Sequence, residues 1–289
     1  MKNTVWNALR LSDMSEPITC QLCPHYCKLN EGQIGFCGAR QAKSGEVQPL
    51  NYGKITSLAL DPIEKKPLAY YHPGSMILSV GSFGCNMVCP FCQNYHISDR
   101  KREPHRVHDI TPEQLTALAK SEKNRGNIGV AFTYNEPLIA FEFVLDTAKL
   151  AKTEDLKIAV VTNGQINEPY LKELLPYVSA WNIDLKSFSE TNYKKLGGSL
   201  RTVLRTIELA QAAAHVEITT LVVPGISDNE DEMREEAKYL AALNPNIPLH
   251  LSRYFPCYKY TEPATDITKM YALKGIAEQY LNRVRLGNM

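Results

Sequence analysis

Residues 76–94 read MILSVGSFGCNMVCPFCQN, a β-strand pattern that leads directly into three cysteines. Met76–Phe83 is rich in apolar and β-branched residues, as expected of a buried strand. Cys85, Cys89 and Cys92 follow on one short loop. In a parallel α/β sheet the loop after a strand lies at the carboxyl edge, where ligands collect. We therefore expect these three thiols to face a binding site at that edge.

From residue 76 onward, short β-branched runs alternate with amphipathic stretches. Further strands are predicted at Ile128–Thr133, Lys157–Thr162, Ala180–Asp184, Val216–Val223 and Pro248–Tyr254. Helices are predicted between them, at a capping box from Thr111 to Gln114 and at Pro137–Lys152, Pro169–Pro176, Arg201–Ala214, Asn229–Leu243 and Asp266–Leu281. About six strand–helix units indicate an α/β protein with a parallel sheet. Because a closed eight-stranded barrel needs more strands, we expect a partial (βα)6 barrel over residues 76–289.

The composition is ordinary for a folded protein, with 44% hydrophobic and 22% charged residues. Lys and Arg number 32 and Asp and Glu 31, which argues against nucleic acid or an acidic membrane as a partner. No apolar run is long enough to span a bilayer, and the first residues, MKNTVWNALRLSDM, lack the apolar centre of a signal peptide. We expect a cytoplasmic protein.

Residues 1–75 lack the strand–helix alternation and hold a second group of cysteines, Cys20, Cys23, Cys27 and Cys37. Clustered thiols in a chain without an export signal indicate metal ligands rather than disulfides. We expect a small N-terminal extension organised around a metal. Both tetrahedral zinc and an iron–sulfur cluster fit four thiolates, and His25 could replace one of them.

Three thiolates on one loop can hold three irons of a cubane cluster and leave the fourth iron open to a ligand. The alternatives are three buried cysteines, or a zinc site that takes a ligand from elsewhere. The spacing C-x3-C-x-aromatic-C, with Phe91 at the aromatic position, resembles the signature of the radical S-adenosylmethionine (SAM) superfamily. The resemblance implies a [4Fe–4S] cluster on Cys85, Cys89 and Cys92, with SAM bound beside Phe91. It also implies reductive cleavage of SAM to a 5′-deoxyadenosyl radical.

Polar residues after the later strands are candidates for binding SAM. Tyr134-Asn135-Glu136-Pro137 resembles the Gly-Gly-Glu-Pro motif that binds the methionine amino group in this superfamily, with Tyr134 and Asn135 in place of two glycines. Glu136 could accept hydrogen bonds from that ammonium group. Alternatively, it only begins a helix, where the helix dipole favours an acidic residue. Thr162 and Asn163 could reach the ribose or the carboxylate, although Asn163-Gly164 is also a common turn.

Two further positions are candidates for direct roles in the reaction. Asp184-Leu185-Lys186 resembles the Asp-x-Lys segment of enzymes that activate pyruvate formate-lyase, which places Asp184 and Lys186 on the active-site side. The alternative is an exposed ion pair of little energetic value. His250, on the sixth predicted strand, is a weaker candidate, and Cys257 is expected to be an ordinary thiol.

The whole chain resembles the radical SAM member of the AmmeMemoRadiSam system, a neighbour of the pyruvate formate-lyase activating enzymes. The matching stretches are Cys20–Cys37, Asp61–Leu68, His72-Pro73-Gly74, Gly84–Asn94, Thr133–Pro137, Thr162–Gly164, Asn182–Lys186, Val222–Asp228 and Gly287-Asn288. The resemblance implies an electron donor such as flavodoxin or ferredoxin, and Memo-like and AMMECR-type proteins as partners.

Three functions are consistent with these residues. The first is a radical SAM enzyme that acts on a protein, for example one that installs a glycyl radical in a partner. The second is a radical SAM enzyme that modifies a small molecule or another protein side chain. The third is a non-catalytic iron–sulfur or zinc module for electron transfer or binding.

Overall fold

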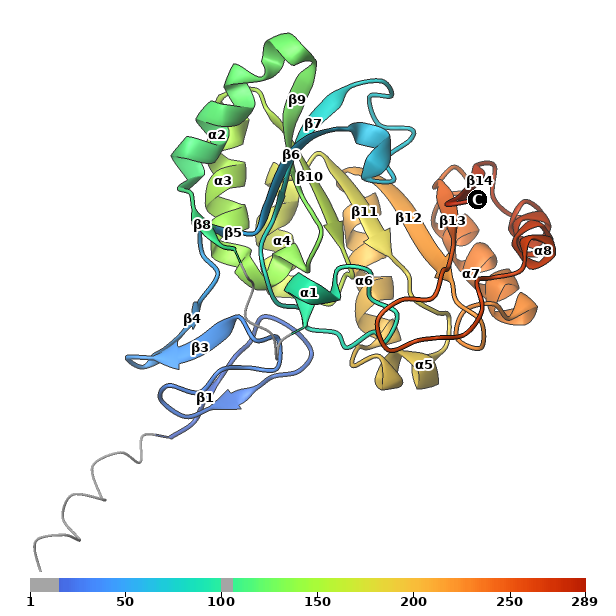
Figure 1. The fold of residues 1–289 in the computed structure, drawn as a ribbon, viewed down its shortest axis with the longest axis horizontal. Coiled ribbons are helices and arrows are strands. Elements are labelled where there is room, and N and C mark those ends of the chain that lie inside the picture. Colours follow the sequence, from blue (N-terminus) through green and yellow to red (C-terminus); the bar gives the residue numbers. More distant parts are fainter. Residues whose placement is uncertain (1–15, 100–105) are drawn as a thin grey trace, which may run out of the picture.

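A computed structural model describes residues 16–99 and 106–289 of the chain. Its centre is an eight-stranded sheet in the order β14-β13-β12-β11-β10-β9-β7-β6 (Figure 1). All neighbouring strands run parallel except β6 and β7, which are antiparallel. The strands are β6 (Ser57–Pro62), β7 (Met76–Gly81), β9 (Asn127–Phe132), β10 (Lys157–Thr162), β11 (Ala180–Asp184), β12 (His215–Val222), β13 (Leu249–Arg253) and β14 (Val284–Gly287).

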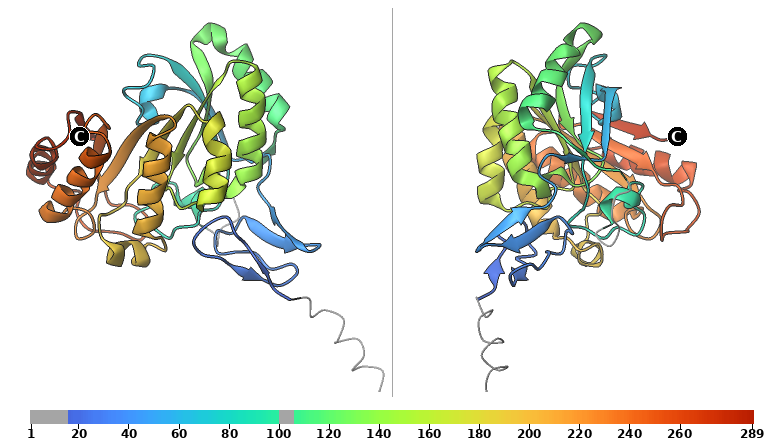
Figure 2. Two further views of the ribbon diagram at one scale, coloured as in Figure 1. Left: turned by 180° about the vertical axis from the view of Figure 1, so that it is seen from behind. Right: turned by 60° about the vertical axis from the view of Figure 1, so that its left-hand side comes forward.

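Helices connect the parallel strands, and several of them lie across one face of the sheet (Figure 2). The capping box predicted at Thr111 is confirmed, because its side chain and that of Gln114 bond each other's backbone N–H groups. The longer helices are α2 (Pro112–Ser121), α3 (Phe141–Thr153), α4 (Glu168–Leu174), α6 (Leu200–Gln211), α7 (Glu230–Leu243) and α8 (Ile267–Ala277). The shorter ones are α1 (Tyr95–Ser98), α5 (Glu190–Lys195), η2 (Ile63–Lys65), η3 (Lys123–Arg125), η4 (Pro137–Ala140) and η5 (Leu175–Tyr177).

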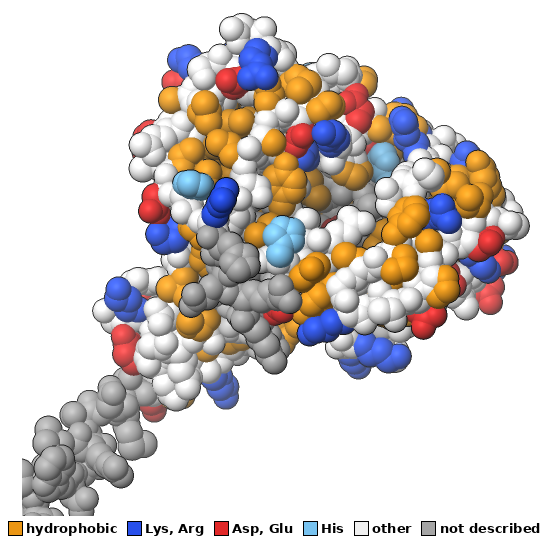
Figure 3. Space-filling view, viewed as in Figure 1, with side chains coloured by type: hydrophobic (Ala, Val, Ile, Leu, Met, Phe, Trp, Pro, Cys, Tyr) orange, Lys and Arg blue, Asp and Glu red, His pale blue; other side chains and the backbone are white. Residues whose placement is uncertain are grey.

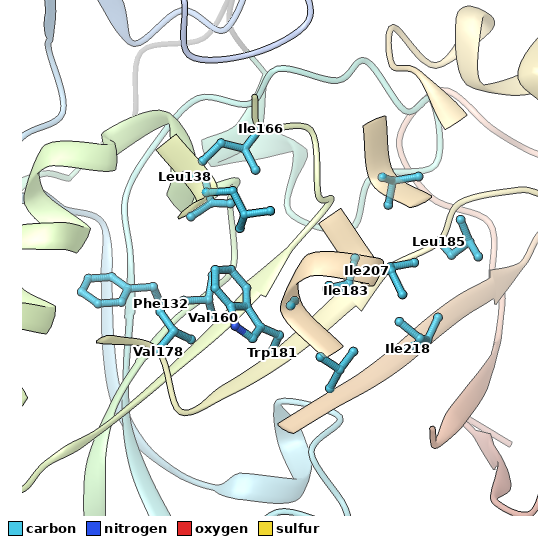
Figure 4. Packing of buried hydrophobic residues seen from close by; sticks show 14 of the residues in the cluster. Phe132, Leu138, Val160, Ile166, Val178, Trp181, Ile183, Leu185, Ile207 and Ile218 are labelled. Atoms are coloured by element: carbon cyan, nitrogen blue, oxygen red, sulfur yellow. The ribbon is translucent and has the colours of Figure 1, made fainter. Parts of the chain in front are cut away.

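The main hydrophobic core lies between the sheet and these helices. Phe132, Val160, Trp181 and Ile218 extend from successive strands into it, and Ile207 meets them from α6 (Figure 4). Alternate strand residues point to the opposite face, as the two-residue period of a strand requires. On that inner face a smaller cluster forms from Ile63, Leu68, Ile77, Ala131, Ala159 and Ala180.

The six predicted strands are confirmed within two residues at each end. Two more strands join the sheet at its edges, β14 and β6, and neither was expected. β6 lies within the segment assigned to the extension, so the sheet begins before residue 76. In the described part of the chain, the two edge strands β14 and β6 do not pair with each other. The sheet is mostly parallel, and the partial barrel stays a prediction.

The N-terminal extension consists of short hairpins below the sheet (Figure 1). Arg40 anchors it to α3 through a bidentate pair with Glu142, at 2.7 and 2.8 Å, and through the carbonyl of Ile139. The strands of the extension are β1 (Ile18–Thr19), β2 (Lys28–Leu29), β3 (Arg40–Lys43), β4 (Glu46–Pro49) and β5 (Lys54–Ile55), the last paired with β8 (His108–Asp109).

Within residues 16–99 and 106–289, every helix is too short or too polar to cross a bilayer.

Candidate functional site

A cavity of about 730 Å³ opens at the carboxyl ends of the parallel strands. This face of the molecule is visibly hollowed, with hydrophobic and charged side chains along the walls (Figure 3). Every site residue predicted from the later strands lines the cavity together with the three-cysteine loop. They are Cys85, Cys89, Phe91, Cys92, Asn135, Glu136, Thr162, Asn163, Asp184, Lys186 and His250.

The three-cysteine loop is held from several sides. The backbone N–H of Gly84 donates to Ile97, that of Cys85 to Cys37 and that of Val88 to Leu196. Gly84 has φ +83°, and a Cβ at this position would lie 2.7 Å from the carbonyl oxygen of Cys37. Only glycine therefore allows the two chain segments to approach so closely.

The three thiols of the loop are free, line the cavity and are only partly exposed. Burial raises the pKa of all three, most strongly that of Cys85, so a thiolate there requires a compensating positive charge such as a metal. Among the described residues, no three His, Cys, Asp or Glu side chains could hold a single metal ion as placed. In a cubane cluster with one open iron, each of the other three irons binds one thiolate. Three cysteine sulfurs beside an open cavity fit that requirement.

Glu136 is the most buried acidic group in the cavity wall, at 3% exposure. Its carboxylate accepts hydrogen bonds from Thr162 Oγ1 at 2.7 Å, from the backbone N–H of Asn163 at 2.8 Å and from that of Leu138 at 3.0 Å. Burial nevertheless raises the pKa of Glu136 to about 7. A bound cation would offset that desolvation, which is what binding of an ammonium group requires. The carboxylate also caps η4, so the alternative structural role is present as well.

Asn163 links Glu136 to the cysteine loop. Its side-chain nitrogen donates to Asn86 Oδ1 at 2.9 Å and lies 3.6 Å from the sulfur of Cys85. Asn86 is 1% exposed and in turn donates to the carbonyl of Gln165. The predicted role of Asn163 in binding SAM stays a prediction, and the structure adds a second role, that of supporting the loop.

Asn135 is turned toward the backbone rather than into open space. Its oxygen accepts from the N–H of Ser82, and its nitrogen donates to the carbonyls of Phe83, Gly84 and Glu136. These bonds use the whole amide to fix the chain just before Cys85. A direct contact of this side chain with SAM stays a prediction, although the residue lines the cavity.

Asp184 and Lys186 both face the cavity and form an ion pair at 2.7 Å. Burial disfavours the charge on Lys186, but Asp184 and the nearby Cys89 outweigh it and raise the lysine pKa. The lysine therefore stays charged beside the cysteine loop. The predicted alternative of an exposed ion pair does not fit, because the side chains of Lys186 and Asp184 are only 17% and 26% exposed, and the active-site role stays a prediction.

His250 lies in the wall of the cavity, and its Nε2 is 2.6 Å from Glu217 Oε2. Glu217 is fully buried and also bonds His215 and the N–H groups of Ala69 and Tyr70. Despite its burial, these donors lower the pKa of Glu217 to about 2. Sequence reasoning missed Glu217, although an acidic residue inside the apolar run HVEITTLVV was a signal of a paired buried charge.

A second unpredicted network joins two residues of the cavity wall, Lys66 and Tyr134, to Asp61 behind them. The buried Lys66 pairs with Asp61 at 2.9 Å, and Tyr134 Oη donates to the same carboxylate at 2.8 Å. Despite partial burial, Lys66 and Tyr134 lower the pKa of Asp61 to about 2. Tyr134 has φ +73°, an uncommon conformation for a tyrosine. The hydrogen bond to Asp61 holds the Tyr134 side chain in place at this position, where the motif resemblance would have a glycine.

Cys257 lies beside the three-cysteine loop. Its sulfur is 3.6 Å from the carbonyl oxygen of Cys92, and the following Lys259 N–H donates to Pro90. Tyr258 stacks on Tyr95 with ring centroids 4.6 Å apart. This turn therefore packs against the outside of the three-cysteine loop.

Fold and site together define an α/β scaffold with a cysteine loop and a buried carboxylate at the carboxyl edge of its sheet. Residues 79–238 match the Radical SAM superfamily. The chain belongs to that superfamily, whose members use a [4Fe–4S] cluster and SAM, and it is an enzyme of the radical SAM type.

Two relatives and one solved structure place the chain further. It is 36% identical to an uncharacterized protein of Methanocaldococcus jannaschii, over 94% of this chain and 81% of that protein. It is 28% identical to the pyruvate formate-lyase 1-activating enzyme of Escherichia coli, over 70% of this chain and 88% of the enzyme. Streptococcus suis SuiB bound to SAM shares the fold, with TM-score 0.55, 14% identity, and 70% and 47% of the two chains covered.

Proposed function

We propose that this enzyme cleaves SAM reductively and uses the resulting radical to abstract a hydrogen atom from a protein, specifically from a glycine of a partner. One observation carries the first part. The three-cysteine loop and the buried carboxylate of Glu136 face the same cavity of about 730 Å³. That arrangement offers a site for a cluster and, beside it, an acceptor for a cationic amino group.

In this proposal Cys85, Cys89 and Cys92 hold the cluster, and SAM occupies the cavity. A cluster held by these cysteines, once reduced by an external donor, would supply the one electron needed to cleave SAM to methionine and a 5′-deoxyadenosyl radical. Glu136 binds the amino group of SAM, and Thr162 and Asn163 orient Glu136 through the bonds described above. Phe91, at 3% exposure, gives the loop an apolar wall that helps to exclude water.

The Asp184–Lys186 pair is proposed to lie against the substrate side of the cavity. Lys186 supplies a fixed positive charge near the cysteine loop, and Asp184 supplies a hydrogen-bond acceptor next to it. His250, fixed by Glu217, would contact the substrate deeper along β13. These three residues would position the group that loses its hydrogen atom.

The choice of a glycine in a partner protein is supported by similarity to the activating enzyme of Escherichia coli. Membership in the AmmeMemoRadiSam system, with Memo-like and AMMECR-type partners and a flavodoxin or ferredoxin as donor, rests on the sequence resemblance and is part of the same proposal. The second candidate, modification of a small molecule or another side chain, uses the same SAM site and differs only in what enters the cavity.

Isotope transfer distinguishes these functions. Host cells are grown on α-deuterated glycine, and their lysate is divided into a protein fraction and a small-molecule fraction. Each fraction is incubated anaerobically with the reconstituted enzyme, SAM and dithionite, and 5′-deoxyadenosine is analysed by mass spectrometry. We expect deuterium in 5′-deoxyadenosine from the protein fraction.

Each other result has a definite meaning. Deuterium that comes only from the small-molecule fraction would replace the protein substrate by a small molecule. Unlabelled 5′-deoxyadenosine would remove glycine as the target, while the SAM chemistry would stand. No 5′-deoxyadenosine at all would contradict the whole proposal and favour a non-catalytic metal module.

A further inference from the structure

The cysteines of the N-terminal extension form one group in space. Cys20, Cys23 and Cys37 are buried, at 7 to 8% exposure, and Cys27 is partly exposed. The N–H of Cys20 donates to the carbonyl of Cys27 at 2.9 Å, and the N–H of Phe36 donates to the sulfur of Cys27 at 3.4 Å.

His25 is placed as a support for the three-cysteine loop. Its Nε2 lies 2.8 Å from the carbonyl oxygen of Asn86, and its ring stacks on Phe36 with centroids 3.9 Å apart. A histidine engaged in this way leaves the four thiols as the natural donor set. Four thiolates in so small a unit, with little apolar core of its own, match a site that a metal completes.

Two connections join this group to the loop that carries Cys85. The carbonyl of Cys37 accepts the N–H of Cys85 at 3.1 Å. His25 Nε2, from the same segment of the extension, lies 2.8 Å from the carbonyl oxygen of Asn86, and Asn86 Oδ1 accepts from Asn163, whose nitrogen reaches the sulfur of Cys85 at 3.6 Å. A ligand of one group is thus separated from a ligand of the other by a single backbone hydrogen bond.

We propose that Cys20, Cys23, Cys27 and Cys37 hold a second iron–sulfur cluster, which passes electrons to the cluster on Cys85, Cys89 and Cys92. A cubane takes each thiolate on a different iron, whereas a zinc ion draws all four sulfurs to one point. The C-x2-C-x3-C spacing of the first three cysteines suits a cubane. The relay rests on the proposed radical function, but the second cluster itself does not.

The electron transfer needs an external low-potential donor, such as a reduced flavin or iron–sulfur protein. That donor gives one electron to the second cluster, which gives one electron to the first, and no atom changes place. The partly exposed Cys27 marks the entry side. The exposed side chains of Tyr26 and Ile34, at 50% and 51% exposure, lie near it and provide apolar surface for the donor.

Iron content tests the second cluster independently of SAM chemistry. The Cys85→Ala/Cys89→Ala/Cys92→Ala variant, which cannot cleave SAM, is purified anaerobically and analysed for iron, sulfide and zinc. We expect about four irons in this variant, about four in Cys20→Ala/Cys23→Ala, and about eight in the wild type and in the control Cys257→Ala. Zinc in the triple variant, or no metal, overturns the second cluster, even if the wild type cleaves SAM.

The choice of reductant tests the relay. Dithionite is small and reaches the first cluster directly, so Cys20→Ala/Cys23→Ala should form 5′-deoxyadenosine within roughly twofold of the wild-type rate. With reduced flavodoxin the same variant should be slower by roughly tenfold or more. Equal rates with flavodoxin, or equal losses with both reductants, would overturn the relay. If the variant fails to fold, the iron content of the triple variant still decides the existence of the cluster.

Discussion

Glu136 and Glu217 are both buried carboxylates, yet their environments move their pKa values in opposite directions. Desolvation outweighs three hydrogen bonds at Glu136 and raises its pKa to about 7. At Glu217 the two histidines and the N–H of Tyr70 outweigh desolvation and lower the pKa to about 2. Glu217 therefore has histidine partners within the protein, whereas the proposed cationic partner of Glu136 is the amino group of SAM.

Glu136→Gln should weaken SAM binding without affecting the cluster. The substitution keeps the shape and removes the charge, and a charged hydrogen bond contributes about 1.5–3 kcal/mol, so we expect affinity to fall roughly 10- to 100-fold. The change that SAM produces in the EPR spectrum of the reduced cluster gives the affinity. Iron content should be unchanged, and Glu235→Gln on the exposed face of α7 is the matched control. Wild-type affinity in Glu136→Gln would exclude this carboxylate from the SAM site.

Glu217→Gln should remove an acid-sensitive part of the stability. Because the pKa of Glu217 is lowered from 4.5 to about 2, its ionised form stabilises the fold above pH 4.5, and that stabilisation is lost as the pH falls toward 2. We expect the variant to be less stable than the wild type at pH 6, by an amount on the order of 3 kcal/mol. Urea denaturation at pH 6 and at pH 3.5 measures the difference, which should shrink at the lower pH. A difference independent of pH would show that lost packing, not lost charge, is responsible.

For single residues, the sequence predicts the candidate site residues better than the residues that hold them in place. Cys85, Glu136 and Asp184 could be predicted to line the cavity because each lies at or shortly after the end of a strand in a characteristic pattern. The supporting roles of Asn86 and Glu217 could not be predicted, since their importance comes from partners 61 and 33 residues away in the chain. Contacts of that range depend on the folded sheet rather than on local spacing.

Among the secondary-structure elements, the six central parallel strands are predicted from the sequence, but the two edge strands of the sheet are not. The central strands are largely buried and rich in apolar and β-branched residues. β6 and β14 are edge strands whose residues are mostly only partly buried, and β14 has just four residues. Because the sequence pattern of an edge strand is weak, neither strand was predicted.

Helix α7 carries an unpaired buried acid, Glu236, at 2% exposure. It accepts a hydrogen bond from Thr220 on β12, but burial raises its pKa to about 8. The folded protein thus holds a proton that the unfolded chain releases near pH 4.5, so stability is lost as the pH rises from 4.5 to 8.

Glu236→Gln should therefore stabilise the protein under basic conditions. The amide keeps an acceptor for Thr220 and cannot ionise, so we expect a gain at pH 8 on the order of 4 kcal/mol and almost none at pH 4.5. Thermal unfolding at the two pH values measures it, with Glu235→Gln as the control on the same helix. A variant that is less stable than the wild type at pH 8 would contradict the assigned protonation.

For the whole molecule, the segment from β6 to β7 completes the sheet rather than belonging to a separate unit. Ile63 and Leu68 are fully buried on the inner face of the sheet. The side chain of Asn182 donates to the carbonyl of Pro67, and Glu217 accepts from Ala69 and Tyr70. The predicted boundary at residue 75 therefore cuts through a packed region.

Truncation should reveal that dependence. A chain that begins at Met76 loses Ile63 and Leu68, each worth about 1.5–3 kcal/mol of burial, together with the pairing of β6. We expect it to lose its cooperative thermal transition, whereas a chain that begins at Tyr52 should retain one. Circular dichroism during heating compares the two. Equal transitions would establish residues 76–289 as an independent domain.

The inner face of the sheet has two tiers along the same strands. One tier, around Ile77, Ala131, Ala159 and Ala180, is apolar and covered by Ile63 and Leu68, and the other tier, toward the strand ends, borders the cavity. Selection can therefore exchange side chains such as Leu221 and Ser252 in the second tier while the first tier keeps the scaffold intact. New substrate preferences can evolve in this protein with little change in its folding.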